Sequence, residues 1–461
     1  MSTRTAATFS PPVMEARRWL AGVVFPDDRP LINVSQAAPV EPPPREMRQV
    51  MADIALNRDD AHLYGPVLGL PELRSELASQ ISAHYAGPVR AAQTAITSGC
   101  NQAFAAAVAS LCSEGDEIII PTPWYFNHKM WLDMSGVAAV PLPAGAGMLP
   151  DPEQAAALIT RRTRAIALVT PNNPTGAEYP EGLVQAFFDL ARDRGIALIL
   201  DETYRDFDSR SGPPHRLFQD PDWDDNLIHL YSFSKAYRLT GHRVGAIAAS
   251  ETRLAEVEKF LDTVAICPSQ IGQHAALWGM QNLGRWLAGE RQEILARRQA
   301  ITDNMPALTA NGWKLLGLGG YFAYVEHPFP ESSGELAPRM VRDAGVLSLP
   351  GTMFTPVGDV TGQRQLRLAF ANLDVAGIGV LFDRLSQLHE NRSLGADGPF
   401  GVGSGWLWRS EFHRQHTHRW HRRRQADFGR SVCTRAATAN PRHRSTDQRA
   451  VELSTSADHR P

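Results

Sequence analysis

Lysine is scarce in this chain of 461 residues, because only four of its 46 basic residues are lysines: Lys129, Lys235, Lys259 and Lys314. Cysteine is equally rare, and the four cysteines form no CxxC pair, which argues against a disulfide framework and against a zinc site. The sequence also has no run of about 18 apolar residues and no basic and then apolar N-terminus. We therefore expect no membrane span, no secretory signal and a cytoplasmic location.

The charge is distributed unevenly along the chain. The overall net charge is −3, yet residues 401–461 hold 12 arginines, no lysine and five acidic residues. This composition predicts a basic, disordered tail over residues 396–461. Its histidine and arginine run, residues 413–424, could attract a metal or bind nucleic acid nonspecifically. Since arginines repel cations and no carboxylate or thiolate set accompanies the histidines, we expect no metal and no specific nucleic acid partner.

The remaining sequence is that of a globular protein, with 43% hydrophobic residues. Residues 1–45 are punctuated by prolines and predict an irregular N-terminal arm. Over residues 46–284, apolar β-branched runs alternate with helical patterns, which indicates an α/β fold with a mostly parallel central sheet flanked by helices. Residues 285–392 predict a smaller α+β domain, joined by part of the arm.

One of the few lysines occupies an unusual place. Lys235, in YSFSKAYRLTGHRVG, directly follows an apolar run that predicts a buried strand. Partial burial lowers the pKa of an amine, and a neutral amine forms a Schiff base with an aldehyde. Taken alone, the segment is more typical of a surface lysine in a loop.

Three other motifs supply complementary chemistry. PNNPTG places Asn173, and DETYRDF places Asp201 and Tyr204, at the ends of predicted strands, whereas SGCNQAFAAAV places Gly99 and Cys100 at the start of a helix. A carboxylate can pair with a protonated ring nitrogen, and asparagine and tyrosine can hydrogen-bond a phenolate oxygen. A helix N-terminus attracts phosphate. Together with an amine, these groups describe a site for pyridoxal 5′-phosphate.

In this order and spacing, the PNNPTG, DETY and SFSK-x(7)-R motifs resemble those of the class I/II aminotransferases, a fold-type I family of pyridoxal-phosphate enzymes related to aspartate aminotransferase. The resemblance spans about residues 30 to 390. It implies that Lys235 forms the Schiff base and moves a proton between the substrate and the cofactor. It further implies that Asp201 keeps the pyridine nitrogen protonated and that Asn173 and Tyr204 contact the 3′-oxygen of the ring.

The resemblance extends to further cofactor contacts. Tyr125, in PTPWYFNH, matches the aromatic residue that stacks on the cofactor ring, although ordinary core packing would also explain it. The expected phosphate ligands are Ser232, Ser234 and Arg243, together with the backbone at Gly99 and Cys100.

Two matches concern the partner subunit and the substrate. YGPVLGLPELR resembles a segment whose tyrosine, here Tyr64, reaches the partner's active site, which implies a homodimer. In RQLRLAFAN, Arg367 rather than the nearby Arg364 matches the arginine that binds the α-carboxylate of the substrate.

The substrate side chain is less constrained. A glycine-containing loop of the family is replaced by VSQAAP, which puts Ala37 at the substrate, where Asn173 and Tyr125 are also expected. Gln36, Trp124 and Tyr321 are candidates for the side-chain pocket or are merely structural. No second arginine for a dicarboxylic substrate is identifiable.

The motifs favour amino transfer between an amino acid and a 2-oxo acid. The same groups also serve lyases and oxidases that act on amino acids, as well as regulators that bind the cofactor without catalysis. Only about 30 residues precede the first predicted strand, which is too few for a helix-turn-helix module.

Overall fold

The computed structural model describes residues 3–389. The predictions for residues 396–461, including the histidine and arginine run, lie outside the described residues. Within residues 3–389, no helix has the length and apolar character needed to cross a bilayer.

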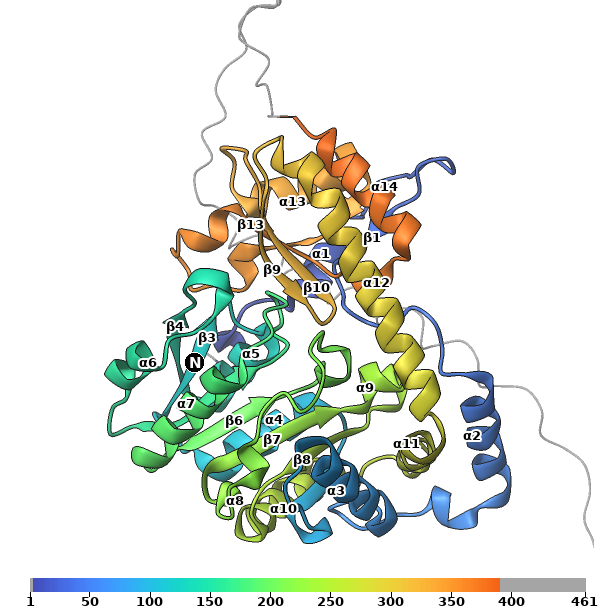
Figure 1. The fold of residues 1–461 in the computed structure, drawn as a ribbon, viewed down its shortest axis with the longest axis vertical. Coiled ribbons are helices and arrows are strands. Elements are labelled where there is room, and N and C mark those ends of the chain that lie inside the picture. The colour runs from blue at the N-terminus through green and yellow to red at the C-terminus, as the bar shows by residue number, and fades with distance from the viewer. Residues whose placement is uncertain (1–2, 390–461) are drawn as a thin grey trace, which may run out of the picture. The chain divides into compact units, whose positions relative to one another are not determined.

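A seven-stranded sheet forms the larger part of the described chain (Figure 1). Its strand order is β2-β8-β7-β6-β5-β3-β4, and β8 runs antiparallel to the other six strands. The strands are β2 (Thr94–Thr97), β3 (Glu117–Thr122), β4 (Ala138–Pro143), β5 (Thr163–Val169), β6 (Ala197–Asp201), β7 (Leu227–Ser232) and β8 (Gly245–Ala248). The predicted α/β class and mostly parallel sheet are confirmed.

Both faces of this sheet are covered by helices. In β6, Leu198 and Leu200 belong to one core cluster, whereas Ala197 and Ile199 belong to another on the opposite face. Strands buried on both faces need continuous apolar sequence, which explains the apolar runs. The helices are α3 (Pro71–Tyr85), α4 (Cys100–Leu111), α5 (Phe126–Ser135), α6 (Pro152–Leu158), α7 (Glu181–Asp193), α8 (Trp223–Asn226), α9 (Phe233–Ala236), α10 (Glu251–Ala265) and α11 (Gln270–Asn282).

A second, antiparallel sheet follows in the order β12-β13-β10-β9. It consists of β9 (Lys314–Gly319), β10 (Phe322–Glu326), β12 (Leu349–Pro350) and β13 (Gln365–Leu368), and it is accompanied by α12 (Gly284–Thr309), α13 (Ser333–Ala344) and α14 (Val375–Ser386). The predicted domain boundary at residues 284 and 285 falls at the start of α12, although the division itself stays a prediction.

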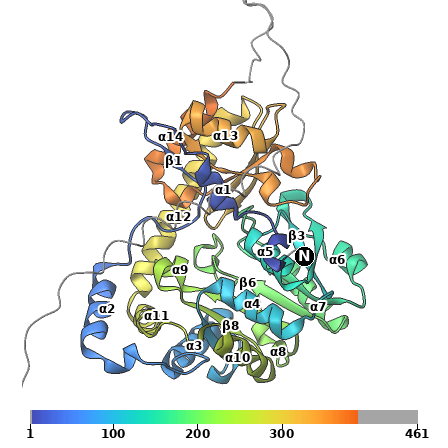
Figure 2. The ribbon, with the colours of Figure 1, turned by 180° about the vertical axis from the view of Figure 1, so that it is seen from behind.

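The N-terminal arm is more ordered than its prolines predict. It contains a 3-10 turn (Arg4–Ala7), the helix α1 (Pro12–Arg18) and the short strand β1 (Ile32–Asn33), and α2 (Arg45–Asn57) follows it. Proline suits the first position of a helix, and Ala16 of α1 packs in a core cluster with Val341 and Leu347, so tertiary contacts stabilise this short helix. β1 (Figure 2) pairs in parallel with β11 (Val346–Leu347) in a separate two-stranded sheet, which attaches the arm to the segment directly before β12.

Candidate active site

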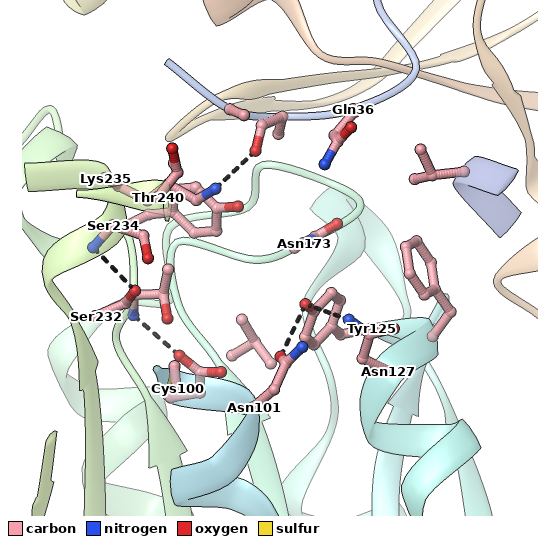
Figure 3. A pocket seen from close by; sticks show the side chains of 18 of the residues that line it. Gln36, Cys100, Asn101, Tyr125, Asn127, Asn173, Ser232, Ser234, Lys235 and Thr240 are labelled. Atoms are coloured by element: carbon pink, nitrogen blue, oxygen red, sulfur yellow. Dashed lines mark hydrogen bonds between the residues drawn. The ribbon is translucent and has the colours of Figure 1, made fainter. Parts of the chain in front are cut away.

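The carboxyl ends of β3, β5, β6 and β7 open into a cavity of about 430 Å³, which the N-terminal arm and β13 complete (Figure 3). Such a volume suits a small ligand. The cavity is lined by eleven of the predicted site residues: Ala37, Cys100, Tyr125, Asn173, Asp201, Tyr204, Ser232, Ser234, Lys235, Arg243 and Arg367.

Lys235 lies in the single turn of α9, directly after β7, with its side chain in the cavity. Its Nζ donates a hydrogen bond of 2.7 Å to the carbonyl oxygen of Ala37. Burial, with the positive charges of Arg243 and Arg367, lowers the pKa of Lys235 to about 8. A substantial fraction of this amine is therefore neutral near physiological pH.

Asp201 is the last residue of β6 and is buried. Its Oδ1 accepts a hydrogen bond of 3.0 Å from the Thr203 amide, and its Oδ2 lies 3.3 Å from His128 Nε2. Burial pushes the pKa of Asp201 upward, but the hydrogen bonds from His128 and Thr203 outweigh it, so the pKa is lowered. Asp201 is thus a buried carboxylate that stays ionised.

His128 is held in place by an aromatic stack. Its ring lies against Phe104 of α4, with centroids 3.7 Å apart and planes within 12°. Tyr125 packs against the edge of the same imidazole at 4.9 Å. This functional neighbour of Asp201 was not predicted from the sequence, although it lies only three residues after Tyr125 and on the same helix turn.

Arg367, on β13, is only 2% exposed and joins the second sheet to the cavity. Its Nη1 donates to Asn173 Oδ1 at 2.9 Å, its Nη2 donates to the Ser35 carbonyl oxygen, and its Nε has no hydrogen-bond partner. Burial lowers the pKa of Arg367 to about 10. The buried guanidinium can therefore donate a further hydrogen bond through Nε. Arg364 instead donates to the His327 carbonyl oxygen and does not line the cavity.

Two tyrosines enclose the middle of the cavity. Tyr125 donates to Asn101 Oδ1 at 3.2 Å and accepts from Asn127 Nδ2 at 2.9 Å (Figure 3). The Tyr204 ring lies 5.9 Å from Lys235 Nζ. Burial raises the pKa of both phenols, so each keeps its proton.

One end of the cavity is built for an anion. Arg243 Nη1 donates to Ser234 Oγ at 3.3 Å and to the Thr240 carbonyl oxygen at 3.1 Å. Gly99, with a φ of +86°, precedes the first residue of α4, and a Cβ there would lie 2.2 Å from Arg243 Nη2. The positive φ favours glycine at this position, and a Cβ would displace the guanidinium from the helix N-terminus, where free amides attract negative charge. Burial raises the pKa of the Cys100 thiol, which therefore stays neutral.

Some predicted residues lie elsewhere. Tyr64 is 79% exposed and does not line the cavity. Trp124 and Tyr321 are buried in core clusters and also do not line it, whereas Gln36 does. Arg17 of α1 lines the cavity as well, and no sequence pattern pointed to it.

Residues 29–385 match the family model described as aminotransferase class I and II. The chain belongs to the class I and II aminotransferases. As a member, it is a transaminase that depends on pyridoxal 5′-phosphate, which confirms the predicted family, activity and cofactor.

Named relatives are similar over most of their length. An arginine–pyruvate transaminase of Pseudomonas aeruginosa is 30% identical over 321 residues, which is 66% of this chain and 80% of that protein. An aromatic aminotransferase of Arabidopsis thaliana is 28% identical, over 67% of this chain and 77% of its own. A solved Thermus thermophilus aspartate aminotransferase mutant has a TM-score of 0.75 at 23% identity, covering 84% of this chain and 98% of its own, which shows the shared fold.

The cavity of this aminotransferase fits the cofactor of the family. The region around Gly99 and Arg243 offers a guanidinium, the Ser234 hydroxyl and helix N-terminal amides, which are the donors that a phosphate requires. The ionised carboxylate of Asp201 suits a protonated pyridine nitrogen, and the Lys235 amine suits an aldehyde. No group of three histidine, cysteine or acidic residues that could hold a metal ion occurs within the described residues 3–389.

Proposed function

We propose that Lys235 is the amine that holds the cofactor as a Schiff base and the group that carries the proton during amino transfer between an amino acid and a 2-oxo acid. The observation that supports this role is its lowered pKa of about 8 inside a cavity that also holds Asp201, Asn173 and Arg367. When bound, pyridoxal phosphate supplies an aldehyde and a ring that withdraws electrons from the substrate α-carbon.

Lys235 acts through Nζ. A neutral amine can accept a proton, and the positive charges of Arg243 and Arg367 favour this neutral form. In the described structure, Nζ rests on the Ala37 carbonyl oxygen, so this contact must break when the amine turns toward a substrate.

Asp201 keeps a proton at the ring nitrogen by offering a fixed negative charge. His128 and the Thr203 amide hold the carboxylate in position, so we assign His128 as a positioning residue. Asn173 and Tyr204 are assigned to the 3′-oxygen, and Tyr125 to stacking on the ring. The phosphate is assigned to Ser232, Ser234, Arg243 and the amides at Gly99 and Cys100.

Arg367 is assigned to the α-carboxylate of the substrate. Its Nε is buried without a partner, and its guanidinium carbon lies 5.0 Å from the Phe354 ring centroid and 5.1 Å from that of Phe322. These apolar walls strengthen a charge-assisted pair with a carboxylate by excluding water. Asn173, Tyr125 and Ala37 are assigned to the adjoining substrate surface.

We further propose a cytoplasmic homodimer in which Tyr64 reaches the active site of the partner subunit. Tyr64 is exposed together with Leu63, Leu56 and Val264. The Gly65 amide donates to Cys267 Sγ at 3.4 Å, which brings the segments around Tyr64 and Val264 together. Exposed apolar surface of this kind is typical of an interface.

An absorbance titration tests the catalytic assignment. The purified holoenzyme is expected to lose the visible absorbance of its cofactor with a suitable amino acid and to regain it with a 2-oxo acid. Lys235→Ala is expected to abolish both changes, whereas Lys259→Ala, on the exposed face of α10, leaves them intact. Undiminished turnover in Lys235→Ala would refute the role of this lysine, and no amino acid response in the native enzyme would refute the proposed function.

A further inference from the structure

Two side chains from the N-terminal arm meet at the mouth of the cavity. Arg17 lies on α1 and Gln36 lies in the loop after β1, and both line the cavity. Arg17 Nη2 donates a hydrogen bond of 2.8 Å to Gln36 Oε1. The sequence places these residues 19 positions apart, and no local pattern predicts that they touch.

The contact fixes the orientation of the Gln36 amide. A guanidinium has only donors, so the amide must turn its oxygen toward Arg17. Gln36 Nε2 then faces away from Arg17, and Figure 3 shows it turned toward the part of the cavity that holds Asn173. The pair therefore presents only N–H donors to a ligand.

The position of Gln36 relates this pair to the reacting groups. The residues on either side of Gln36 are hydrogen-bonded to two site residues. The Ser35 carbonyl oxygen accepts a hydrogen bond from Arg367, and the Ala37 carbonyl oxygen accepts one from Lys235. A substrate whose α-carboxylate binds Arg367 and whose amino group lies near Lys235 faces the segment 35–37. Its side chain then extends toward Gln36.

Charge balance points to the class of side chain. The cavity is lined by four cationic residues and one carboxylate, and that carboxylate, Asp201, is already paired with His128. The proposed phosphate and α-carboxylate contacts account for Arg243 and Arg367. Among the described residues, Arg17 has no carboxylate partner, whereas its neighbour Arg18 pairs with Glu15.

We propose that Arg17 and Gln36 recognise the side chain of the amino-acid substrate, and that this side chain carries a carboxylate. This inference rests on the proposed function. Val13, Met14 and Phe126 also line the cavity and would suit a neutral side chain, but a neutral side chain would not use the donors of Arg17 and Gln36, which are exposed to solvent at the cavity mouth. A carboxylate satisfies the donors of Arg17 and Gln36 at once.

Matched arginine variants of the holoenzyme test the proposal. Arg17→Gln is expected to lower kcat/KM for aspartate and glutamate about tenfold, because a charge-assisted hydrogen bond is lost, and to change the values for asparagine and glutamine less than about twofold. Arg18→Gln makes the same charge change one residue away, outside the cavity lining, and is expected to leave all four values unchanged. An equal loss for acidic and neutral amino acids in Arg17→Gln would overturn the proposal.

Gln36→Glu reverses the chemistry of the second residue. The new carboxylate would pair with Arg17, so turnover of the acidic amino acids is expected to fall further than in Arg17→Gln, while the neutral ones are retained. Binding of unreactive acids provides a readout apart from turnover: by calorimetry, Arg17→Gln is expected to weaken succinate about tenfold and butyrate little. Equal effects on succinate and butyrate would contradict the assignment.

The outcomes separate this inference from the proposed function. If the native enzyme transaminates neutral or aromatic amino acids in preference to acidic ones, recognition of a carboxylate is wrong and transamination stands. If no amino acid changes the cofactor absorbance, both are wrong.

Discussion

The titration of Lys235 offers a direct test of the electrostatics of the site. An ordinary lysine with a pKa near 10.4 is about 0.1% neutral at pH 7.4, whereas a pKa of about 8 makes about 20% neutral. Burial is the main cause, and Arg243 and Arg367 add to it. In the cofactor-free protein, Lys235 should therefore become reactive more than two pH units below an ordinary lysine.

The scarcity of lysine makes the measurement clean. Reductive methylation with isotopically labelled formaldehyde from pH 6 to 10.5, followed by peptide mass spectrometry, reports each of the four lysines separately. Lys259, whose side chain is 71% exposed, serves as the internal reference. The midpoint of each profile reflects protonation, whereas limited access to a buried amine lowers the rate at every pH.

We expect a Lys235 midpoint near pH 8. In Arg243→Gln the midpoint should rise, because one positive charge is removed, but it should stay below 10.4, because burial remains. A Lys235 midpoint that coincides with that of Lys259 would refute the reasoning, as would an Arg243→Gln midpoint that falls.

Three further perturbations follow from the described contacts. His128→Phe keeps the stack on Phe104 but removes a hydrogen bond to the Asp201 carboxylate, so the pKa of Asp201 should rise. Cofactor affinity, measured by equilibrium dialysis, should then fall about tenfold. Unchanged affinity would contradict the positioning role of His128. Arg367→Lys should raise the apparent KM for amino acids at least tenfold while the cofactor stays bound, and an unchanged KM would place the carboxylate contact elsewhere. Burial lowers the pKa of His327 to about 4, and neither ring nitrogen has a hydrogen-bond partner. In the unfolded chain the pKa of this histidine returns to about 6.5, so the imidazole takes up a proton on unfolding when the pH is below that value. Stability to urea should accordingly fall by about 2 to 3 kcal/mol between pH 6.5 and 4, and His327→Phe should reduce this slope; an equal slope in both proteins would assign it to other groups.

The residues at strand ends were predictable because local sequence determines their position. Asp201, Asn173 and Lys235 each follow an apolar run that is long enough for one buried strand, so the parallel sheet brings them to the same edge. The family resemblance then supplied their roles.

Residues placed by tertiary contacts were not predictable in this way. Helix α1 has only seven residues and depends on packing against Val341 and Leu347, so its local pattern is weak. Arg17 reaches the cavity only because this helix forms and packs there. The pairing of His128 with Asp201 spans 73 positions and leaves no periodic signal.

The wide sequence separation within the site has a consequence for protein synthesis. The groups assigned to the cofactor lie between residues 99 and 243, whereas Arg367 bonds to Ser35, which is 332 positions earlier. On the ribosome, the cofactor groups emerge well before β13 does, since chains leave in order from the N-terminus. The substrate-binding contact is therefore completed last, and a nascent chain that ends before β13 already contains the cofactor groups but has no anchor for an amino acid.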